Sequence, residues 1–304
     1  MEMRAVFGDW LEKTMAENSK VCVVDADLAR ANGTMKLRTL YPDRALDVGV
    51  AEQDMASVAA GLSSYGFIPF ITSFTPFATR RICDQIMISI AYAKQNVKIV
   101  GTDPGIAAEL NGGTHMSFED IGILRSIPTM VIYEPVDNVQ FAQALPQILE
   151  HYGPVYIRMF RKDVEDVFDK DYKFNLFGAD VIKEGDDITI LSTGIMVKQS
   201  LLAAEILKEQ GIHAEVINVH TIKPLDEETI LRSAGKTGKV LTCENHNVIG
   251  GLYSAVSELL AEKLPTKMGK IGIHDKFGQV GKTPDLLKAY GMTVEDIVTA
   301  AKAL

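Results

Sequence analysis

Length, composition and charge limit the functions that this chain can have. Its 304 residues correspond to roughly two domains of about 150 residues each. With 47% hydrophobic and 23% charged residues, the chain has the composition of an ordinary globular protein and not of a disordered or fibrous one. The net charge of -9 argues against a broad electrostatic surface for nucleic acid or anionic lipid.

The cysteines and the N-terminus indicate a cytoplasmic protein. The chain has three cysteines, an odd number, at Cys22, Cys83 and Cys243. None of them forms a CxxC motif, so the sequence favours neither a disulfide framework nor a zinc site. The chain begins without a basic region followed by an apolar stretch, and no apolar run approaches the roughly 18 residues of a membrane span. We therefore expect a protein with no membrane segment, no leader and no metal ligands of its own.

In the first half, short β-branched runs alternate with longer segments of helical periodicity. This alternation is typical of parallel strands joined by helices. The predicted strands are 21–25, 68–72, 97–101, 130–133 and 155–158, and the predicted helices are 52–64, 76–94 and 137–150.

A charged, aperiodic stretch at 161–173 separates this half from a second α/β pattern. We place a first domain at 1–165, a linker at 166–178 and a second domain at 179–304. The fold class is α/β, with two doubly wound domains. In the second domain the predicted strands are 188–192, 214–219, 240–243 and 270–273, and the predicted helices are 198–210 and 250–263.

Two polar stretches lie where an open parallel sheet binds its ligands, just past the carboxyl ends of strands. In the stretch 47–53, Glu52 follows a strand and a glycine turn and then enters an apolar helix. An acidic residue also simply favours a helix N-terminus, so this position alone does not establish a function. The stretch 101–120 is a glycine-rich loop that includes His115, and long polar loops between buried strands are commonly functional.

Together with Phe74 and Phe77, these segments resemble the transketolases. The matching elements of the first half are a glycine-x-x-glutamate at 49–52, an aromatic pair, and a Gly-Gly-Thr-His loop at 112–115. The resemblance continues through 191–194, 222–226 and Glu244-Asn245-His246, so it covers nearly the whole chain in order.

The resemblance implies the last two thirds of a thiamine-diphosphate enzyme, namely a pyrimidine-binding domain followed by a transketolase C-terminal domain. It also implies that the diphosphate-binding domain is absent. Such a domain carries a Gly-Asp-Gly motif, and both Gly-Asp pairs here, at 8–9 and 185–186, lack the third glycine. Mg²⁺ needs oxygen ligands around the diphosphate. We therefore expect a partner, an N-terminal transketolase subunit, to hold the metal and the diphosphate in a two-plus-two assembly.

The resemblance also implies roles for individual residues. Glu52 takes the place of the glutamate that hydrogen-bonds the aminopyrimidine ring, and His115 takes that of a histidine facing the reacting carbon. Phe74, Phe77 and Asp27 match cofactor-site residues of the family. Arg80 stands where relatives have a tyrosine, and we assign it no role.

For substrate binding, the resemblance points to Arg4, Asp103, Asn111 and Arg161. Arg4 and Arg161 match arginines that hold a sugar phosphate, which two guanidinium groups bind well, and Arg158 competes with Arg161 for that place. Three residues differ from the family: Asp103 replaces a histidine, Asn111 an aspartate, and Ala31 a serine that contacts phosphate. The implied reaction transfers a two-carbon ketol unit from a ketose or its phosphate to an aldose or its phosphate, with the sugars left open.

Three alternatives remain. The chain also resembles the corresponding part of a 1-deoxyxylulose-5-phosphate synthase, although Pro104 stands where that enzyme usually has an arginine. A β subunit of a 2-oxo acid dehydrogenase has the same two-domain length, but its histidine loop differs from 111–119. A non-catalytic paralogue is disfavoured because Glu52, Phe74, Phe77 and His115 are all retained.

Overall fold

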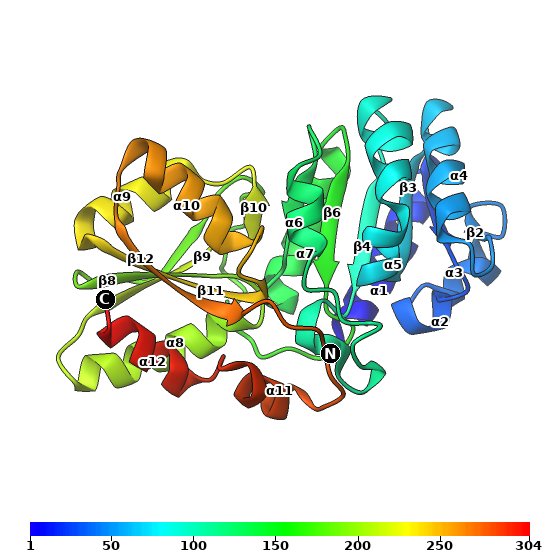
Figure 1. Ribbon diagram of the computed structural model, residues 1–304. Helices are drawn as coiled ribbons and strands as arrows, with labels where there is room; N and C mark the ends of the chain where they lie inside the picture. The colour runs from blue at the N-terminus through cyan, green and yellow to red at the C-terminus, as the bar shows by residue number, and fades with distance from the viewer. The chain divides into compact units, whose positions relative to one another are not determined.

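The computed structural model describes residues 1–304, which form two compact units (Figure 1). The first unit comprises residues 1–104 and 123–176, and the second comprises 105–122 and 177–304. The segment 105–122 thus groups with the second unit although it lies within the first half of the sequence. The predicted boundaries at 165 and 178 stay a prediction.

The first unit is an open parallel sheet with helices packed on it, as the alternating pattern predicts. Its strands lie in the order β5-β6-β4-β3-β1-β2, and every pairing among them is parallel. The helical elements are α1 (Met3–Glu17), α2 (Ala29–Asn32), α3 (Met35–Leu40), α4 (Glu52–Ser64), α5 (Thr75–Ala78), η1 (Arg80–Ile82), η2 (Gln85–Tyr92) and α7 (Asn138–Glu150). The helix α6 (Asp120–Arg125) begins in residues assigned to the second unit and ends in the first. The strands are β1 (Val21–Asp25), β2 (Ala45–Asp47), β3 (Ile68–Phe74), β4 (Lys98–Thr102), β5 (Val131–Tyr133) and β6 (Val155–Met159).

The strand order creates a switch point between β1 and β3, because the chain adds β2 on one side of β1 and β3, β4 and β6 on the other. Ligands of open α/β sheets bind at the carboxyl ends of strands beside such a point. Asp27 follows β1, Glu52 follows β2, Phe74 ends β3 and Asp103 follows β4. The fold therefore gathers most of the predicted site residues at one edge of this sheet.

One predicted element is wrong. The apolar pattern of 76–94 predicts a single long helix, but the stretch is divided into α5, η1 and the π-helical η2. The break occurs at Thr79, whose backbone (φ -131°, ψ -83°) is not helical and whose hydroxyl bonds the Thr75 carbonyl oxygen at 2.6 Å. The periodicity of apolar residues cannot reveal such a break, because apolar residues keep a helical spacing on both sides of it.

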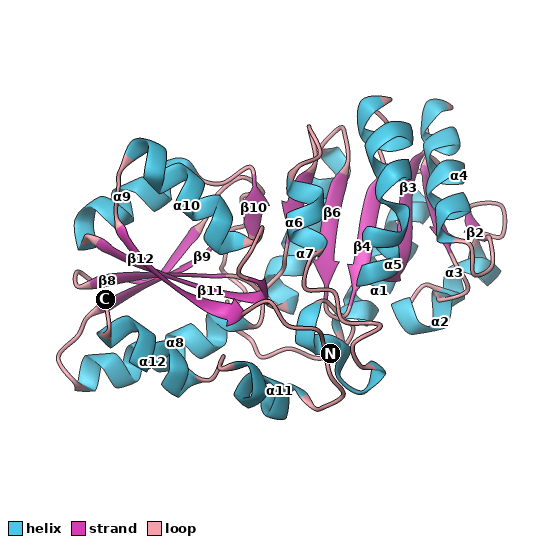
Figure 2. Cartoon of the chain, viewed as in Figure 1, coloured by secondary structure: helices cyan, strands magenta, loops and turns pink.

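The second unit is a smaller five-stranded sheet in the order β12-β11-β8-β9-β7. Its pairings are parallel except at the edge, where β7 runs antiparallel to β9. Figure 2 shows α9 and α10 on one face of this sheet and α8 and α12 on the other. The strands of this sheet are β7 (Asp180–Lys183), β8 (Ile188–Ser192), β9 (Ala214–Asn218), β11 (Lys239–Asn247) and β12 (Lys267–Ile273), and the short strand β10 (Thr221–Lys223) lies outside it. The helical elements are η3 (Gly105–Asn111), α8 (Met196–Glu209), α9 (Glu227–Thr237), α10 (Leu252–Lys263), α11 (Thr283–Tyr290) and α12 (Val294–Lys302).

None of these helices combines the length and the apolar character that crossing a membrane requires.

A fully buried lysine at the start of β4 stabilises the first unit. The Lys98 ammonium bonds Asn96 Oδ1 at 2.7 Å and the carbonyl oxygens of His151 and Gly153 at 2.6 and 2.9 Å. Replacement by methionine leaves these acceptors without their donor, each at a cost of about 1–3 kcal/mol. We expect Lys98→Met to lower the free energy of unfolding by about 3 kcal/mol in urea titrations, while Lys20→Met, at an exposed lysine, should change it little.

The same residue makes stability depend on pH. Burial lowers the pKa of Lys98 to about 7, whereas an unfolded lysine titrates near 10.4. Between these values the unfolded chain binds more protons than the folded one, so the contribution of Lys98 rises with pH, by at most about 1.4 kcal/mol per unit. The difference in unfolding free energy between wild type and Lys98→Met should therefore widen from pH 7 to pH 9, and a constant difference would contradict this origin.

Candidate active site

Glu52 is the first residue of α4, and its carboxylate is buried, with 4% of the residue exposed. The chain reaches it through a tight turn in which Gly49 adopts φ 73° and the Ala51 amide bonds the Gly49 carbonyl oxygen at 2.7 Å. The positive end of the helix dipole favours a carboxylate at this position. The turn and the helix together hold one acidic group out of water at the ligand-binding edge of the sheet.

Arg81 is the partner of Glu52, and the sequence analysis missed it. The Nη1 atom of Arg81 donates to Glu52 Oε1 at 2.8 Å, and its guanidinium carbon lies 3.9 Å from the centre of the Phe77 ring. The residue considered from the sequence was its neighbour, Arg80. Because the helix breaks at Thr79, helical periodicity could not show which of the following side chains points toward Glu52.

Phe74 and Phe77 form an edge-to-face pair, with ring centres 6.3 Å apart and an angle of 64° between the rings. Besides Arg81 over Phe77, the guanidinium of Arg161 lies 4.8 Å from the centre of the Phe74 ring. Aromatic faces attract planar cations in this way. The two rings contact each other, and their role toward a cofactor stays a prediction.

The Glu52 and Phe77 side chains fit an aminopyrimidine ring. In this structure they hold a planar group with N–H donors, the Arg81 guanidinium, which stacks on the aromatic face and donates to the buried carboxylate. An aminopyrimidine is likewise planar and presents nitrogen atoms in its plane. The residues present are therefore of the kind that a thiamine ring requires.

Asp27 lies beside the Glu52 turn. Its backbone adopts φ 60°, and its amide donates to Asp47 Oδ1 at 2.9 Å, as does the amide of Gly49. Arg38 bridges Asp47 to Asp25, with contacts of 2.8 and 2.7 Å. Burial raises the pKa of Asp25, an effect that Arg38 partly offsets. This network fixes the loops after β1 and β2 to each other.

Arg161 and Asp103 form a two-point ion pair at the carboxyl ends of β4 and β6. The Asp103 carboxylate accepts from the Arg161 backbone amide at 3.1 Å and from its Nε at 2.5 Å, and it also contacts Nη2. Arg158, the competing candidate, is fully buried and paired with Glu134 at 2.7 Å. Arg161 keeps 16% of its side chain exposed, which favours it over Arg158 as a ligand for an anion.

Arg4 lies next to Arg161, as a shared anion site requires. The Arg4 amide bonds the Arg161 carbonyl oxygen at 3.3 Å, while its guanidinium bonds the Ala31 carbonyl oxygen at 3.2 Å and Glu2 at 2.7 Å. The backbone of Arg4 packs closely against Gly33. A Cβ atom at position 33 would lie 2.3 Å from the Arg4 carbonyl oxygen, so a side chain at this position would force the two segments apart. The structure thus brings together the three positions matched to phosphate binding, 4, 31 and 161, and places Asp103, which stands where relatives have a histidine, beside them.

Asn111 and His115 belong to the second unit. Asn111 is exposed at the end of η3, and His115 is half-buried. The turn before His115 is closed by its amide, which bonds the Gly112 carbonyl oxygen at 3.0 Å, and its Nδ1 lies 2.9 Å from the Thr114 hydroxyl. This contact helps to orient the imidazole ring.

The structure contains no group of three or more His, Cys, Asp or Glu side chains placed to hold a metal ion. Where the magnesium of a thiamine-diphosphate enzyme would be bound stays a prediction.

Two protein-family models match the chain. Residues 1–166 match the pyrimidine-binding domain of transketolase, and residues 178–297 match the transketolase C-terminal domain. The resemblance and the fold class inferred from the sequence are thereby confirmed.

Individual proteins similar to this chain are also transketolases or related enzymes. The chain is 52% identical over 299 residues, 98% of its length and 93% of the relative's, to the 6-deoxy-6-sulfo-D-fructose transketolase subunit SqwH of Clostridium sp. (strain MSTE9). It is 36% identical to the 1-deoxy-D-xylulose-5-phosphate synthase of Desulforudis audaxviator (strain MP104C), with 98% of the chain covering 47% of that enzyme. A solved structure described as a split gene transketolase, inactive beta4 tetramer, superposes with a TM-score of 0.90 at 39% identity, covering 100% of this chain and 97% of the other. The chain belongs to the transketolase family, of which it carries the pyrimidine-binding and C-terminal domains.

Proposed function

We propose that the chain is one subunit of a split transketolase, which uses thiamine diphosphate to transfer a two-carbon ketol unit from a ketose to an aldose. The observation that carries this proposal is the buried Glu52 carboxylate beside the Phe77 ring, with a planar N–H donor held between them. Burying a carboxylate costs free energy, and Glu52 is buried where open α/β sheets bind their ligands.

Each residue then has a definite task. When bound, thiamine diphosphate supplies the carbon nucleophile that takes up the two-carbon unit. Glu52 forms a hydrogen bond with the ring and shares a proton with a ring nitrogen, Phe77 packs on the ring face, and Asp27 contributes to the cofactor site. His115 passes protons to and from the oxygen atoms of the sugar, a task that suits an imidazole near neutral pH.

A partner subunit completes the enzyme. A related split gene transketolase has been described as an inactive tetramer of its β chains, which supports the proposal that this chain alone does not turn over. The partner is to carry the diphosphate-binding domain and to hold Mg²⁺ through oxygen ligands, and two copies of each chain form the assembly.

Reconstitution tests this function. The chain is mixed with the candidate partner, thiamine diphosphate and Mg²⁺, and ketol transfer is measured from 6-deoxy-6-sulfofructose and from fructose 6-phosphate to an aldose phosphate. We expect transfer by the mixture and none by either chain alone. Transfer by this chain alone, or none by the mixture, would refute the proposal, and formation of 1-deoxyxylulose 5-phosphate would favour the synthase alternative.

We further propose that the donor is a ketose with a sulfonate group at its far end. Arg4 and Arg161 carry two positive charges, and Glu2 and Asp103 bonded to them carry two negative ones, so the cluster is close to neutral. A phosphate monoester has a charge of about -1.5 to -2 at neutral pH, whereas a sulfonate carries a single charge. Asp103 opposes the more highly charged group more strongly, and the 52% identical relative is named for a sulfofructose.

The charge of Asp103 can be removed with little change in shape. Asp103→Asn keeps an oxygen that can accept from the Arg161 amide but no longer neutralises its guanidinium. We expect the ratio of kcat/KM for fructose 6-phosphate to that for 6-deoxy-6-sulfofructose to rise about 10-fold, equivalent to about 1.4 kcal/mol.

Asp163→Asn is the matched control, because Asp163 is an exposed acidic residue near the same strand end whose carboxylate pairs with the chain terminus and not with Arg161. It should leave the ratio unchanged. An unchanged ratio in Asp103→Asn would show that Asp103 does not select the charge of the donor.

A further inference from the structure

The loop that carries Asn111 and His115 is built into the second unit. Both of its flanks are bonded to β11: the Ile106 amide donates to Asn245 Oδ1 at 2.9 Å, and the Asn247 amide donates to the Phe118 carbonyl oxygen at 2.9 Å. Its apolar side chains are part of the core of that unit, namely those of Ile106, Ala108, Met116 and Phe118. The position of the loop is therefore set by the C-terminal domain.

The contact of Asn245 with the Ile106 amide is closely fitted by the surrounding chain. Asn245 is fully buried, and the loop is shaped to receive it at Gly105, which adopts φ 56°. A Cβ atom at Gly105 would lie 2.2 Å from Asn245 Oδ1, so only glycine permits this approach. The amide oxygen of Asn245 thus fixes the point at which the chain leaves β4 and begins the loop.

A second tether holds the middle of the loop. Glu109 has a strained backbone (φ 46°, ψ -115°), and its carboxylate accepts from the hydroxyl and the amide of Thr283, at 2.7 and 3.1 Å, where α11 begins. Nearby, a Cβ atom at Gly113 would lie 2.4 Å from the carbonyl oxygen of Gly278. These contacts lie on either side of Asn111 and just before His115.

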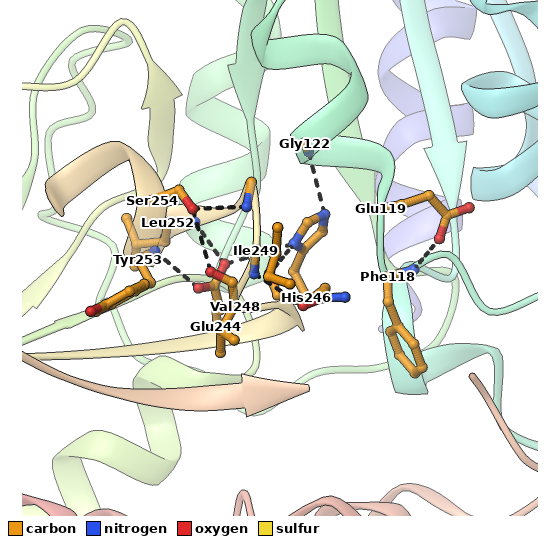
Figure 3. A network of polar contacts seen from close by, with 12 residues as sticks. Phe118, Glu119, Gly122, Glu244, His246, Val248, Ile249, Leu252, Tyr253 and Ser254 are labelled. Carbon is orange, nitrogen blue, oxygen red and sulfur yellow. Dashed lines mark hydrogen bonds and ion pairs between the residues drawn. The ribbon is translucent and has the colours of Figure 1, made fainter. Parts of the chain in front are cut away.

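The far end of the loop meets the same strand through His246 (Figure 3). Its Nδ1 lies 2.6 Å from the Asn247 carbonyl oxygen, an acceptor, so Nδ1 carries the proton and Nε2 accepts from the Gly122 amide at 3.4 Å. Next to it, the buried Glu244 accepts from the first amides of α10, at Leu252 and Tyr253. The segment 244–247 therefore contacts the loop and α10 at once.

We propose that Asn245 is a positioning residue for catalysis, which acts by fixing the loop that carries His115, with the Glu109–Thr283 contact as a second tether. The inference rests on the proposed function for its catalytic consequence, but the tether itself is a property of this chain. It gives the C-terminal domain a task in the reaction although that domain supplies none of the predicted contacts to thiamine through Glu52, Phe74, Phe77 or Asp27.

Hydrogen exchange tests the tether without any turnover. In Asn245→Ala, we expect the amides from Ile106 to His115 to exchange faster while the amides of β1 and α4 in the first unit keep their protection. Asn218→Ala is the matched control, since Asn218 is also a fully buried asparagine of the second unit, bonded to Asp180 in β7 and not to the loop. Unchanged exchange in the loop of Asn245→Ala, or equal loosening in Asn218→Ala, would overturn the proposal.

Kinetics of the reconstituted enzyme test the catalytic consequence. A small displacement of a catalytic group costs up to about 100-fold, and we expect Asn245→Ala to lower kcat about 10- to 100-fold while the Kd for thiamine diphosphate stays unchanged. Thr283→Val, a milder change that keeps the side-chain size, should lower kcat in the same direction by a smaller factor. Asn218→Ala should retain kcat at temperatures where it is folded.

The outcomes separate the two claims. Loosened exchange with kcat unchanged in both Asn245→Ala and Thr283→Val would refute the positioning role. A wild-type mixture without ketol transfer would refute the proposed function, whereas the exchange result would still decide whether Asn245 fixes the loop.

Discussion

We expect Glu52→Gln to fold, to assemble with the partner subunit and to lose almost all ketol transfer. The substitution keeps the size of the side chain and its oxygen atom toward Arg81, but it removes the group that holds the shared proton. General acid–base catalysis by one positioned side chain is worth about 10²- to 10⁴-fold. Glu52 is the only residue to which we assign this proton transfer, so kcat should fall by a factor of about 10² to 10⁴.

The environment of Glu52 makes this effect large. The carboxylate is buried, so water cannot readily substitute for it, and it lies at the N-terminus of a 13-residue helix, which favours its negative charge. The variant loses both the proton acceptor and the charge that pairs with Arg81.

Asp54→Asn is the control for Glu52→Gln. Asp54 lies in the same first turn of α4 but is exposed, so its amide variant makes the same kind of change to the helix terminus without touching the site. It should retain turnover. Turnover near the wild-type value in Glu52→Gln, with thiamine diphosphate bound, would remove Glu52 from the mechanism.

The sequence predicted those parts of the fold that depend on local pattern. The helix 52–64 and the strands 21–25 and 188–192 have the predicted bounds, because each is bounded by a polar or glycine-rich turn and has one clear periodicity. The helix 137–150 was expected to open on a capping residue, and Asp137 indeed accepts from the Gln140 amide at the start of α7. In α7 the apolar periodicity and the capping residue give the same answer.

The sequence did not predict what depends on a break or on distant contacts. The expected helix 76–94 is broken at Thr79, and beyond the break Arg81 donates to Glu52. Likewise, the membership of 105–122 in the second unit depends on contacts with Asn245 and Thr283, which lie more than a hundred residues away along the chain. Local periodicity contains no information on the helix break or on these distant contacts.

The sequence led to candidate residues for the site but did not predict the ion pair between two of them. The proximity of Arg4 and Arg161 followed from the family resemblance, and the structure places them side by side. That Asp103 pairs with Arg161 was not foreseen, since the sequence showed only that a histidine had been replaced. This pairing changes the net charge of the anion site, and it is the basis for proposing a singly charged sulfonate in place of a phosphate.

The second large effect is expected at His115. In His115→Gln the side-chain amide can still form hydrogen bonds but cannot exchange a proton near neutral pH, so proton transfer to the sugar oxygens is lost. We expect kcat to fall about 10²- to 10⁴-fold, as measured in the reconstituted enzyme, with the Kd for thiamine diphosphate unchanged because the proposed cofactor contacts belong to other residues.

The contact of Nδ1 with Thr114 allows a finer test of the same role. Thr114→Val removes the hydroxyl that lies 2.9 Å from Nδ1 but leaves the imidazole, so it should lower kcat by a smaller factor than His115→Gln. His213→Gln, at an exposed histidine of the same unit, should have no effect. If His115→Gln lowered only the affinity for the donor and left kcat intact, His115 would be a binding residue, and the proton transfer would have to be assigned to another group of the second unit or of the partner subunit.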